Sequence, residues 1–328
     1  MPISATVAID ASQFPENVQR DLLDSLRTRH IQPKFLYDSY KQARQWLAIH
    51  EAYSPARRDP ECLAIYDQAC VATAGLVYAC GASVVGLGCG GGQKDAALLR
   101  ALVERDVVVS YVPCDVSVAL VLAAQQAAVA AVPGLCVNPL VLDLARCGDL
   151  AHTIGHAGKA GIPNRRIFTF FGMLPNFESQ VILPRLAELL RKDDLLLLSA
   201  NLAPGPDYAA GVQCVLSGYD NPLTREWLLT VLLDLGIDLG DGDIRFSIED
   251  APDGLKRIVA DFHFARSREL VVSNERFVFK AGETIRLFYS YRHTVPLAHS
   301  LLASHGFAIL GEWVAASGEE GVFLCRRQ

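Results

Sequence analysis

A glycine-rich stretch, VVGLGCGGGQK at residues 84–94, has the residue types and spacing to bind a ligand. An apolar run ends in Gly86-Leu87-Gly88, and the helical pattern DAALLRALVERD follows directly after Lys94. Glycines at such a turn allow a ligand to lie against bare backbone, and they tolerate positive φ angles. The turn alone is compatible with a dinucleotide, with an adenosyl group, or with a purely structural role.

Two acidic residues follow the turn at the ends of predicted strands. Asp115 ends the segment SYVPCD, about 25 residues after the turn, and Asp143 ends LVLD. An acid at the first position accepts hydrogen bonds from both ribose hydroxyls of a nucleotide. An acid at the second can accept from the adenine N6 amine, which favours a single adenosyl group over a dinucleotide. The alternatives are that both are ordinary strand-end acids and that Lys94 is a first-turn helix residue facing solvent.

Strand and helix patterns alternate through the middle of the chain. Nearly continuous apolar strands separated by helices indicate a parallel sheet covered on both faces, with ligands bound at the carboxyl ends of its strands. After Asn201 the pattern changes to a linker and a helical stretch, and from residue 242 onward β-like alternation predominates. The predicted strands of the sheet are 83–88, 107–115, 138–143, 166–172 and 194–202.

The composition argues against several classes of partner. With 328 residues, 51% of them hydrophobic, the chain can bury a large core without metals or disulfides. A net charge of −6 and the lack of a basic block argue against nucleic acid as a partner. No signal peptide is recognisable and no apolar run reaches the ~20 residues of a membrane span, so we expect a cytoplasmic protein with no membrane partner. The nine cysteines form no CxxC pair and the histidines lack metal-ligand spacing, so we expect reduced thiols and no metal.

Six segments of the chain resemble the motifs of one enzyme family. QPKFLYD is similar to PPKWFYD, AYSPARRDPECL to EYYPTRTE, and VVGLGCGGGQK to ELGSGSSxK. YVPCDVS is similar to YxPxDVS, RIFTFFGMLPNF to RxxxFxGSTIGNF, and AGETIRLFYSYRHT to AGExxxTExSxKF. Over nearly its whole length the chain therefore resembles the histidine-specific Nα-methyltransferases of ergothioneine biosynthesis, which use S-adenosylmethionine (SAM).

The resemblance implies an α/β fold, in which a class I SAM-dependent methyltransferase (Rossmann-like) sheet is joined to a second, α+β substrate domain. The sheet domain would comprise residues 62–202 and 293–328. The second domain would comprise residues 1–61, an N-terminal cap, and residues 203–292, an insertion in the C-terminal half. By motif position, the resemblance places SAM against Tyr37, Gly86, Gly88, Lys94, Asp115 and Asp143. It places the amino and carboxylate groups of the small-molecule substrate against Asn176, Tyr37, Tyr53 and Tyr219.

The departures from the family motifs concern the substrate. The glutamate that recognises the histidine imidazole in the family falls on Phe288, although the nearby serine is retained as Ser290. The segment Gly-Ser-Thr-Ile-Gly before the family asparagine has become Gly172-Met173-Leu174-Pro175. A phenylalanine cannot pair with an imidazole, and a site that lacks a needed polar partner discriminates strongly against such a substrate. We therefore expect that histidine is not the substrate.

Two enzymatic interpretations remain. In the first, the protein methylates the α-amine of another amino acid, with Phe288 and Tyr291 lining its pocket. In the second, the α-amine of SAM attacks its own γ-carbon, so that methylthioadenosine leaves and azetidine-2-carboxylate forms. Azetidine-2-carboxylate synthases of bacterial peptide-antibiotic pathways resemble this family, so the product would supply a peptide-synthetase pathway. We favour the second because the polar acceptor group is lost and aromatic faces are available to the sulfonium, an attraction of roughly 0.5–2 kcal/mol.

The residues expected to act are drawn from these motifs. We expect Asn176, Tyr53 and Ser290 to take part in catalysis and Tyr219, Phe288 and Tyr291 to bind substrate. His293 follows them as either a base facing the pocket or a surface histidine, and we expect the latter. A third interpretation, an inactive SAM-binding module, is disfavoured by the intact glycine turn and both acids.

Overall fold

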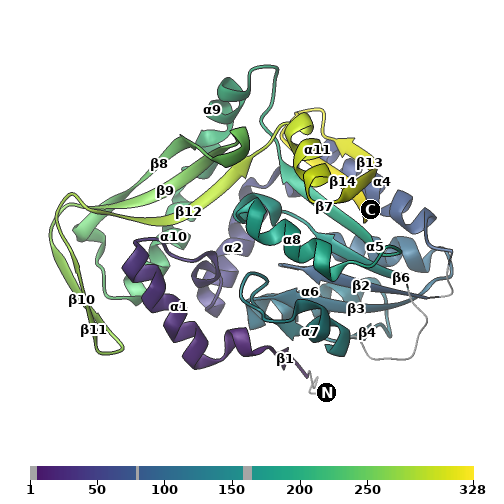
Figure 1. The fold of residues 1–328 in the computed structure, drawn as a ribbon, viewed down its shortest axis with the longest axis horizontal. Coiled ribbons are helices and arrows are strands. Elements are labelled where there is room, and N and C mark those ends of the chain that lie inside the picture. Colours follow the sequence, from purple (N-terminus) through teal and green to yellow (C-terminus); the bar gives the residue numbers. More distant parts are fainter. Residues whose placement is uncertain (1–5, 79–80, 158–164) are drawn as a thin grey trace.

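The computed structural model describes residues 6–78, 81–157 and 165–328, and its largest element is a nine-stranded sheet (Figure 1). The strands lie in the order β1-β5-β3-β2-β6-β7-β14-β13, and β4 pairs with β3. The pairings are parallel except for those of β14 with β7 and β13. This order confirms the predicted class I methyltransferase sheet. The strands are β1 (Ala8–Ile9), β2 (Gly81–Leu87), β3 (Val108–Asp115), β4 (Cys136–Val137), β5 (Leu140–Val141), β6 (Arg165–Phe170), β7 (Leu195–Asn201), β13 (Phe307–Val314) and β14 (Glu320–Arg327).

Helices cover both faces of this sheet, as nearly continuous apolar strands require. One buried cluster joins one face of the strands to α7 (Leu150–Ala157), α8 (Ser179–Leu189) and α11 (Val295–Ser304). A second cluster joins the other face to α4 (Pro60–Gly75), α5 (Gln93–Val103) and α6 (Val118–Ala131). The two cores hold the sheet rigid, so the loops at the carboxyl ends of its strands have a fixed support.

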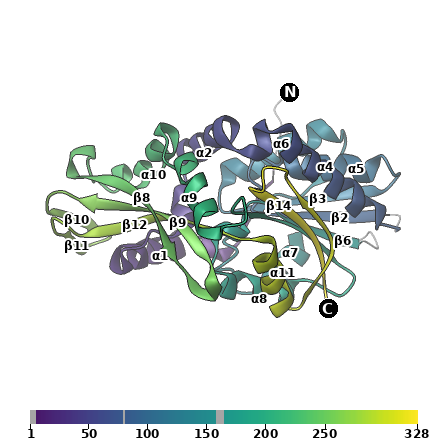
Figure 2. The same cartoon turned by 90° about the horizontal axis from the view of Figure 1, so that it is seen from above.

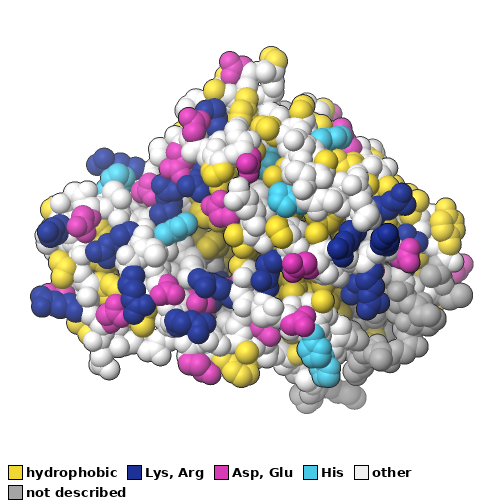
Figure 3. Space-filling view, in the orientation of Figure 1, with side chains coloured by type: hydrophobic (Ala, Val, Ile, Leu, Met, Phe, Trp, Pro, Cys, Tyr) yellow, Lys and Arg dark blue, Asp and Glu magenta, His cyan; other side chains and the backbone are white. Residues whose placement is uncertain are grey.

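A smaller sheet with the order β12-β9-β8 lies in the part of the chain expected as the second domain, and Figures 1 and 2 show it to one side of the main sheet. Its core unites the N-terminal cap with the C-terminal half, since Leu26 and Ile31 share a buried cluster with Trp227 and Phe262. Basic and acidic side chains are intermixed over the surface of this domain (Figure 3), and Arg286 pairs there with Glu249 and Asp261. The elements outside the main sheet are α1 (Pro15–Thr28), α2 (Tyr40–Tyr53), α3 (Pro55–Arg58), α9 (Tyr208–Tyr219), α10 (Pro222–Asp234), β8 (Gly242–Asp250), β9 (Lys256–Phe264), β10 (Arg268–Val272), β11 (Glu275–Phe279), β12 (Thr284–Arg292), and the 3₁₀ turns η1 (Ala11–Gln13), η2 (Pro33–Leu36), η3 (Leu174–Asn176), η4 (Leu239–Asp241) and η5 (Pro252–Gly254).

Two segments differ from the expectation. Residues 8–9 were expected in the cap, but they form β1, which pairs with β5 at the edge of the main sheet. The strand expected at 138–143 is shorter and comprises only β5, while β4 precedes it and is separated from it by Asn138 and Pro139. Proline has no amide hydrogen to donate to a ladder, which explains the break at this place.

Within the described ranges, none of the helices combines the length and the apolar character needed to cross a membrane. Eight of the cysteines are free thiols there, and Cys80 lies outside the described residues.

His293 is fully buried between the two domains, so the expectation of a surface histidine was wrong. Its amide donates to the Asn201 carbonyl (2.9 Å) and its carbonyl accepts from the Ala203 amide (2.8 Å), which ties the end of β12 to the end of β7. Neither ring nitrogen has a hydrogen-bond partner among the described residues. Burial lowers the pKa of His293 to about 4, so the ring is neutral at pH 7.

We expect His293 to make the fold less stable in mild acid. Unfolded, the side chain takes up a proton near pH 6.5, whereas in the fold it does so only near pH 4. The free energy of unfolding should therefore fall by about 2 kcal/mol between pH 6.5 and pH 5 on account of this residue. Urea unfolding at both pH values should show that His293→Phe loses this part of the pH dependence. The exposed control His152→Phe should keep the wild-type slope, and equal slopes in all three proteins would contradict the assignment.

Candidate functional site

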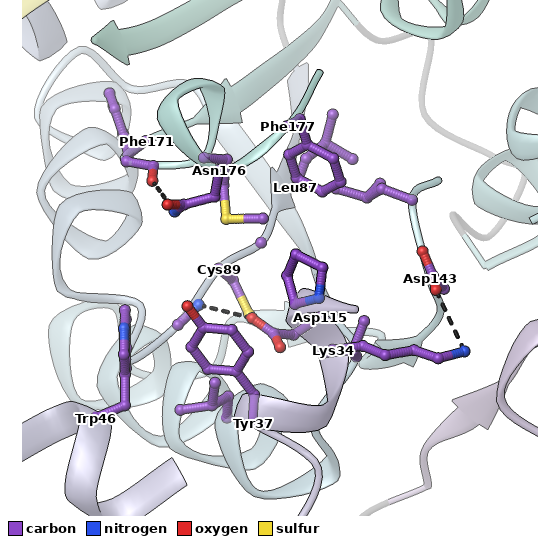
Figure 4. A pocket seen from close by; sticks show the side chains of 18 of the residues that line it. Lys34, Tyr37, Trp46, Leu87, Cys89, Asp115, Asp143, Phe171, Asn176 and Phe177 are labelled. Atoms are coloured by element: carbon purple, nitrogen blue, oxygen red, sulfur yellow. Dashed lines mark hydrogen bonds and ion pairs between the residues drawn. The ribbon is translucent and has the colours of Figure 1, made fainter. Parts of the chain in front are cut away.

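A cavity of about 350 Å³ opens at the carboxyl ends of β2, β3, β5 and β6, within the usual range for small-molecule sites. The main sheet supplies one wall, and η2 and α2 of the cap supply the other (Figure 4). Six of the predicted site residues line it: Tyr37, Gly88, Lys94, Asp115, Asp143 and Asn176.

The glycine turn at the floor of the cavity needs its glycines for two reasons. Gly88, Gly90 and Gly92 have φ angles of +68°, +52° and +74°, which L side chains rarely adopt. A Cβ at Gly92 would also lie 2.6 Å from the Cα of Ala124, and one at Gly90 would lie 2.7 Å from the Trp46 ring. The bare backbone therefore lets α6 and the cap approach the turn closely.

Asp115 is held at the end of β3 by backbone amides. Its Oδ2 accepts from the Gly90 amide and its Oδ1 from the Ser117 amide, both at 3.1 Å. Burial raises the pKa of Asp115 to about 6, although both hydrogen bonds favour the charged form. The carboxylate is thus fixed beside the turn, facing the cavity.

Asp143 lies at the other end of the cavity and is bound to the cap (Figure 4). Its Oδ1 accepts from the Ala145 amide (2.9 Å), and its Oδ2 lies 3.4 Å from the Lys34 ammonium. Lys34 is buried and also pairs with Asp21 of α1. It was not predicted as a site residue, although it stands in the motif QPKFLYD.

Aromatic rings cover the turn from the cap side. The Tyr37 ring packs edge-on against Trp46, with centroids 5.8 Å apart, and the His50 ring lies 4.1 Å from Trp46. Burial lowers the pKa of His50 to about 3, so it contributes a neutral ring. Trp46 and His50 were not predicted. Their spacing of four residues places them on one face of α2, a signal that the helical pattern carries.

Lys94 does not face solvent. Its ammonium lies 3.8 Å from the centroid of the Tyr66 ring and 5.7 Å from that of Phe171. Burial lowers the pKa of this ammonium. The cation is therefore held over aromatic faces at the start of α5, inside the cavity.

Six predicted site residues lie outside the cavity lining. Gly86 is buried within β2, and Tyr53 is 43% exposed at the end of α2. On β12, Phe288 packs against Tyr219 and Trp227. The buried Ser290 contacts Asn201 and Tyr219, and Tyr291 donates to Glu178 (2.5 Å).

Strand alternation explains the arrangement on β12. Successive side chains point to opposite faces of a strand, so 288 and 290 share one face while 289 and 291 share the other. The cavity reaches the second face, where Tyr289 lines it together with Glu178 and His30. Glu178 and His30 were not predicted, and Tyr289 was expected only as one of several aromatic side chains available to the sulfonium, because the register of β12 relative to the cavity is set by tertiary packing.

A family model described as histidine-specific, SAM-dependent methyltransferases matches residues 18–327. The chain belongs to this family. Among similar proteins, the N-methyltransferase imqF of Aspergillus flavus is 26% identical over 83% of this chain and 73% of that protein. A histidine N-alpha-methyltransferase of Mycobacterium tuberculosis is 28% identical over 94% of this chain and 95% of that protein.

A solved structure with a similar sheet is that of magnesium protoporphyrin IX methyltransferase from Synechocystis with bound S-adenosylhomocysteine. It is 15% identical, covers 88% of this chain and 95% of that one, and has a TM-score of 0.43.

The cavity offers the groups that the SAM of this methyltransferase family needs. We propose that Asp115 accepts the ribose hydroxyls and that Asp143 accepts the adenine amine, with the glycine turn between them and the amino-acid end. On this proposal the ligand would lie between the cap and the sheet, where Trp46 closely approaches Gly90.

Adenosyl binding should therefore weaken as Asp115 takes up a proton. Below its pKa of about 6, one oxygen can no longer accept a hydroxyl. Between pH 7.5 and pH 5 the affinity for methylthioadenosine, measured by calorimetry, should fall up to about tenfold. In Asp115→Asn the affinity should be lower throughout and nearly independent of pH. A wild-type affinity that does not change over this range would show that Asp115 does not contact the ligand.

Proposed function

We propose that this member of the SAM-dependent methyltransferase family cyclises SAM to azetidine-2-carboxylate and methylthioadenosine. The α-amine loses its proton, and its nitrogen forms a bond to the γ-carbon. The bond between the γ-carbon and sulfur breaks, its electron pair stays on sulfur, and neutral methylthioadenosine leaves. The product nitrogen remains as a protonated ring amine, so one proton is released for each SAM consumed.

The observation that carries this proposal is the packing and hydrogen bonding on the face of β12 that bears Phe288. In the family motif a glutamate at this position recognises histidine, but here Phe288 packs against Tyr219 and Trp227. The hydroxyl of Ser290 is engaged by Asn201 (3.3 Å) and Tyr219 (3.0 Å). On this face, Phe288 is therefore packed against other rings and the Ser290 hydroxyl is already hydrogen-bonded, so neither is available to hold a second substrate.

The cavity also suits a sulfonium and a neutral amine. Tyr37, Trp46 and Phe171 line the cavity, and the faces of aromatic rings stabilise a cation without a counter-charge. Asn176 reaches the cavity from η3, and its amide donates to the Gly172 carbonyl (3.1 Å), which leaves the side-chain oxygen to orient an amine. A chain folded back on itself needs mainly positioning and exclusion of water.

The second candidate is transfer of the SAM methyl group to the α-amine of an amino acid other than histidine. It is favoured by the names of the relatives, which are an N-methyltransferase and histidine N-alpha-methyltransferases. Asn176 and Tyr37 would then position the acceptor in the same cavity.

Incubation with SAM as the sole substrate should separate these functions. We expect equal amounts of methylthioadenosine and azetidine-2-carboxylate by mass spectrometry, without S-adenosylhomocysteine. A labelled SAM methyl group should stay on methylthioadenosine. Because free SAM decays to methylthioadenosine and homoserine lactone, the azetidine acid is the diagnostic product, and Asp115→Asn with SAM is the matched control.

Two results would contradict the cyclase. SAM that stays intact until an amino acid is added, and then yields S-adenosylhomocysteine, would establish the methyltransferase. SAM that binds but stays intact with every amino acid would indicate a binding module.

A further inference from the structure

Asp95, the third residue of α5, places a buried carboxylate on the cavity. Its Oδ1 accepts from the Thr169 hydroxyl of β6 (2.7 Å), and its Oδ2 accepts from the Tyr111 hydroxyl of β3 (2.5 Å). Both donors come from the strands that flank β2, so the carboxylate is fixed at the centre of the sheet. None of the roles assigned so far uses it.

The carboxylate of Asp95 fills space that Gly86 leaves open. A Cβ at Gly86 would lie 2.3 Å from Oδ2 of Asp95 and 3.0 Å from the Tyr111 hydroxyl. In the family motif ELGSGSSxK an acid stands at the position of Gly86, at the end of the same strand. This chain therefore keeps an acid at that place in space but supplies it from α5.

The strand order indicates which part of the ligand meets Asp95. Neighbouring strands β5, β3, β2 and β6 present Asp143, Asp115, the glycine turn and Thr169 in that order. With adenine at Asp143 and ribose at Asp115, the amino-acid end extends past the turn toward α5 and β6. Lys94 and Asp95 stand there side by side in the chain, a cation and an acid that match the carboxylate and the amine of that end.

We infer that Asp95 binds the α-amine of SAM and accepts its proton, which makes Asp95 a catalytic residue of the proposed cyclisation. The second part of this role, acceptance of the proton, rests on the proposed function. In the step, the N–H bond breaks and its electron pair stays on nitrogen as the nucleophile. The proton goes to a carboxylate oxygen of Asp95 and then to solvent, which accounts for the one proton released per turnover.

The surroundings of Asp95 suit a proton acceptor more than a permanent ion-pair partner. Burial raises the pKa of Asp95 to about 6, and the hydroxyls of Thr169 and Tyr111 keep it from rising further. A carboxylate that is less stable as an ion takes up a proton more readily at neutral pH. The titratable groups that face Asp95 are Lys94 of α5, Tyr111 and Cys114 of β3, Cys89 of the turn and Cys70 of α4. Burial raises the pKa of the three thiols and of the Tyr111 hydroxyl, so these groups are neutral at pH 7. Lys94 is therefore the charged group among these neighbours.

Two ligands that differ only in the amino-acid end test the binding half of the role. S-adenosylhomocysteine has the amine and methylthioadenosine lacks it. In Asp95→Asn, calorimetry should show roughly 10- to 100-fold weaker binding of S-adenosylhomocysteine, as expected for a lost charge-assisted hydrogen bond. Binding of methylthioadenosine should stay within about twofold, which also shows that the site is folded. The control Asp115→Asn should weaken both ligands by the same factor.

The pH dependence of turnover tests whether Asp95 accepts the proton. In the wild type, kcat for azetidine-2-carboxylate formation, measured at saturating SAM so that the effect of Asp115 on affinity drops out, should rise with pH through about 6 as Asp95 ionises. Asp95→Asn should lower kcat by roughly 10²–10⁴-fold and remove that limb, and Asp95→Glu should restore part of it.

Each negative result has a distinct meaning. Equal losses for both ligands in Asp95→Asn would overturn the amine contact while leaving cyclisation in place. An unchanged pH profile in Asp95→Asn would overturn the proton transfer. A wild type that forms no azetidine-2-carboxylate from SAM would overturn the proposed function and the proton transfer with it, while the two-ligand comparison would still decide the amine contact.

Discussion

The close approach of three elements to the bare backbone of the glycine turn is the constraint on which the rest of the site depends. Helix α6 contacts Gly92, Trp46 of the cap lies on Gly90, and Met173 of the β6–η3 loop lies against Gly88. Side chains at these positions would separate the cap from the sheet. The glycines therefore let residues of the cap and of the main sheet line one cavity.

The polar groups of the cavity are ordered along the strand ends, and burial governs their chemistry. Asp143 is neutralised by Lys34, whereas Asp115 and Asp95 are held by amides or hydroxyls and have raised pKa values. An acid that is held only by neutral donors near a cation-binding aromatic wall can accept hydrogen bonds or a proton. The same groups in water would have ordinary pKa values near 3.8 and would take up a proton much less readily at neutral pH.

The departures from the family motifs fall into two kinds. At position 86 the acid is missing from the strand, but Asp95 restores a carboxylate in the same space. At position 288 the acid is replaced by an aromatic ring, and the surrounding rings close over it. The first change keeps a carboxylate close to the glycine turn, and the second removes a carboxylate from the face of β12 that bears Phe288. Both changes are departures from the motifs of the histidine-specific family.

The sequence by itself determined the fold class, the family and the turn with its two strand-end acids. Apolar strands alternating with helices predict a covered parallel sheet, and residues at strand ends must meet at one edge, so Asp115 and Asp143 could be placed without coordinates. Local pattern carries that information because it depends on neighbours in the chain. The tertiary structure alone decided which side chains of β12 face the cavity, that His293 is buried, and that Lys34 and Asp95 line the cavity. These depend on register, on packing between segments far apart in sequence and on the space left by a missing side chain at Gly86, none of which leaves a periodic mark in the sequence.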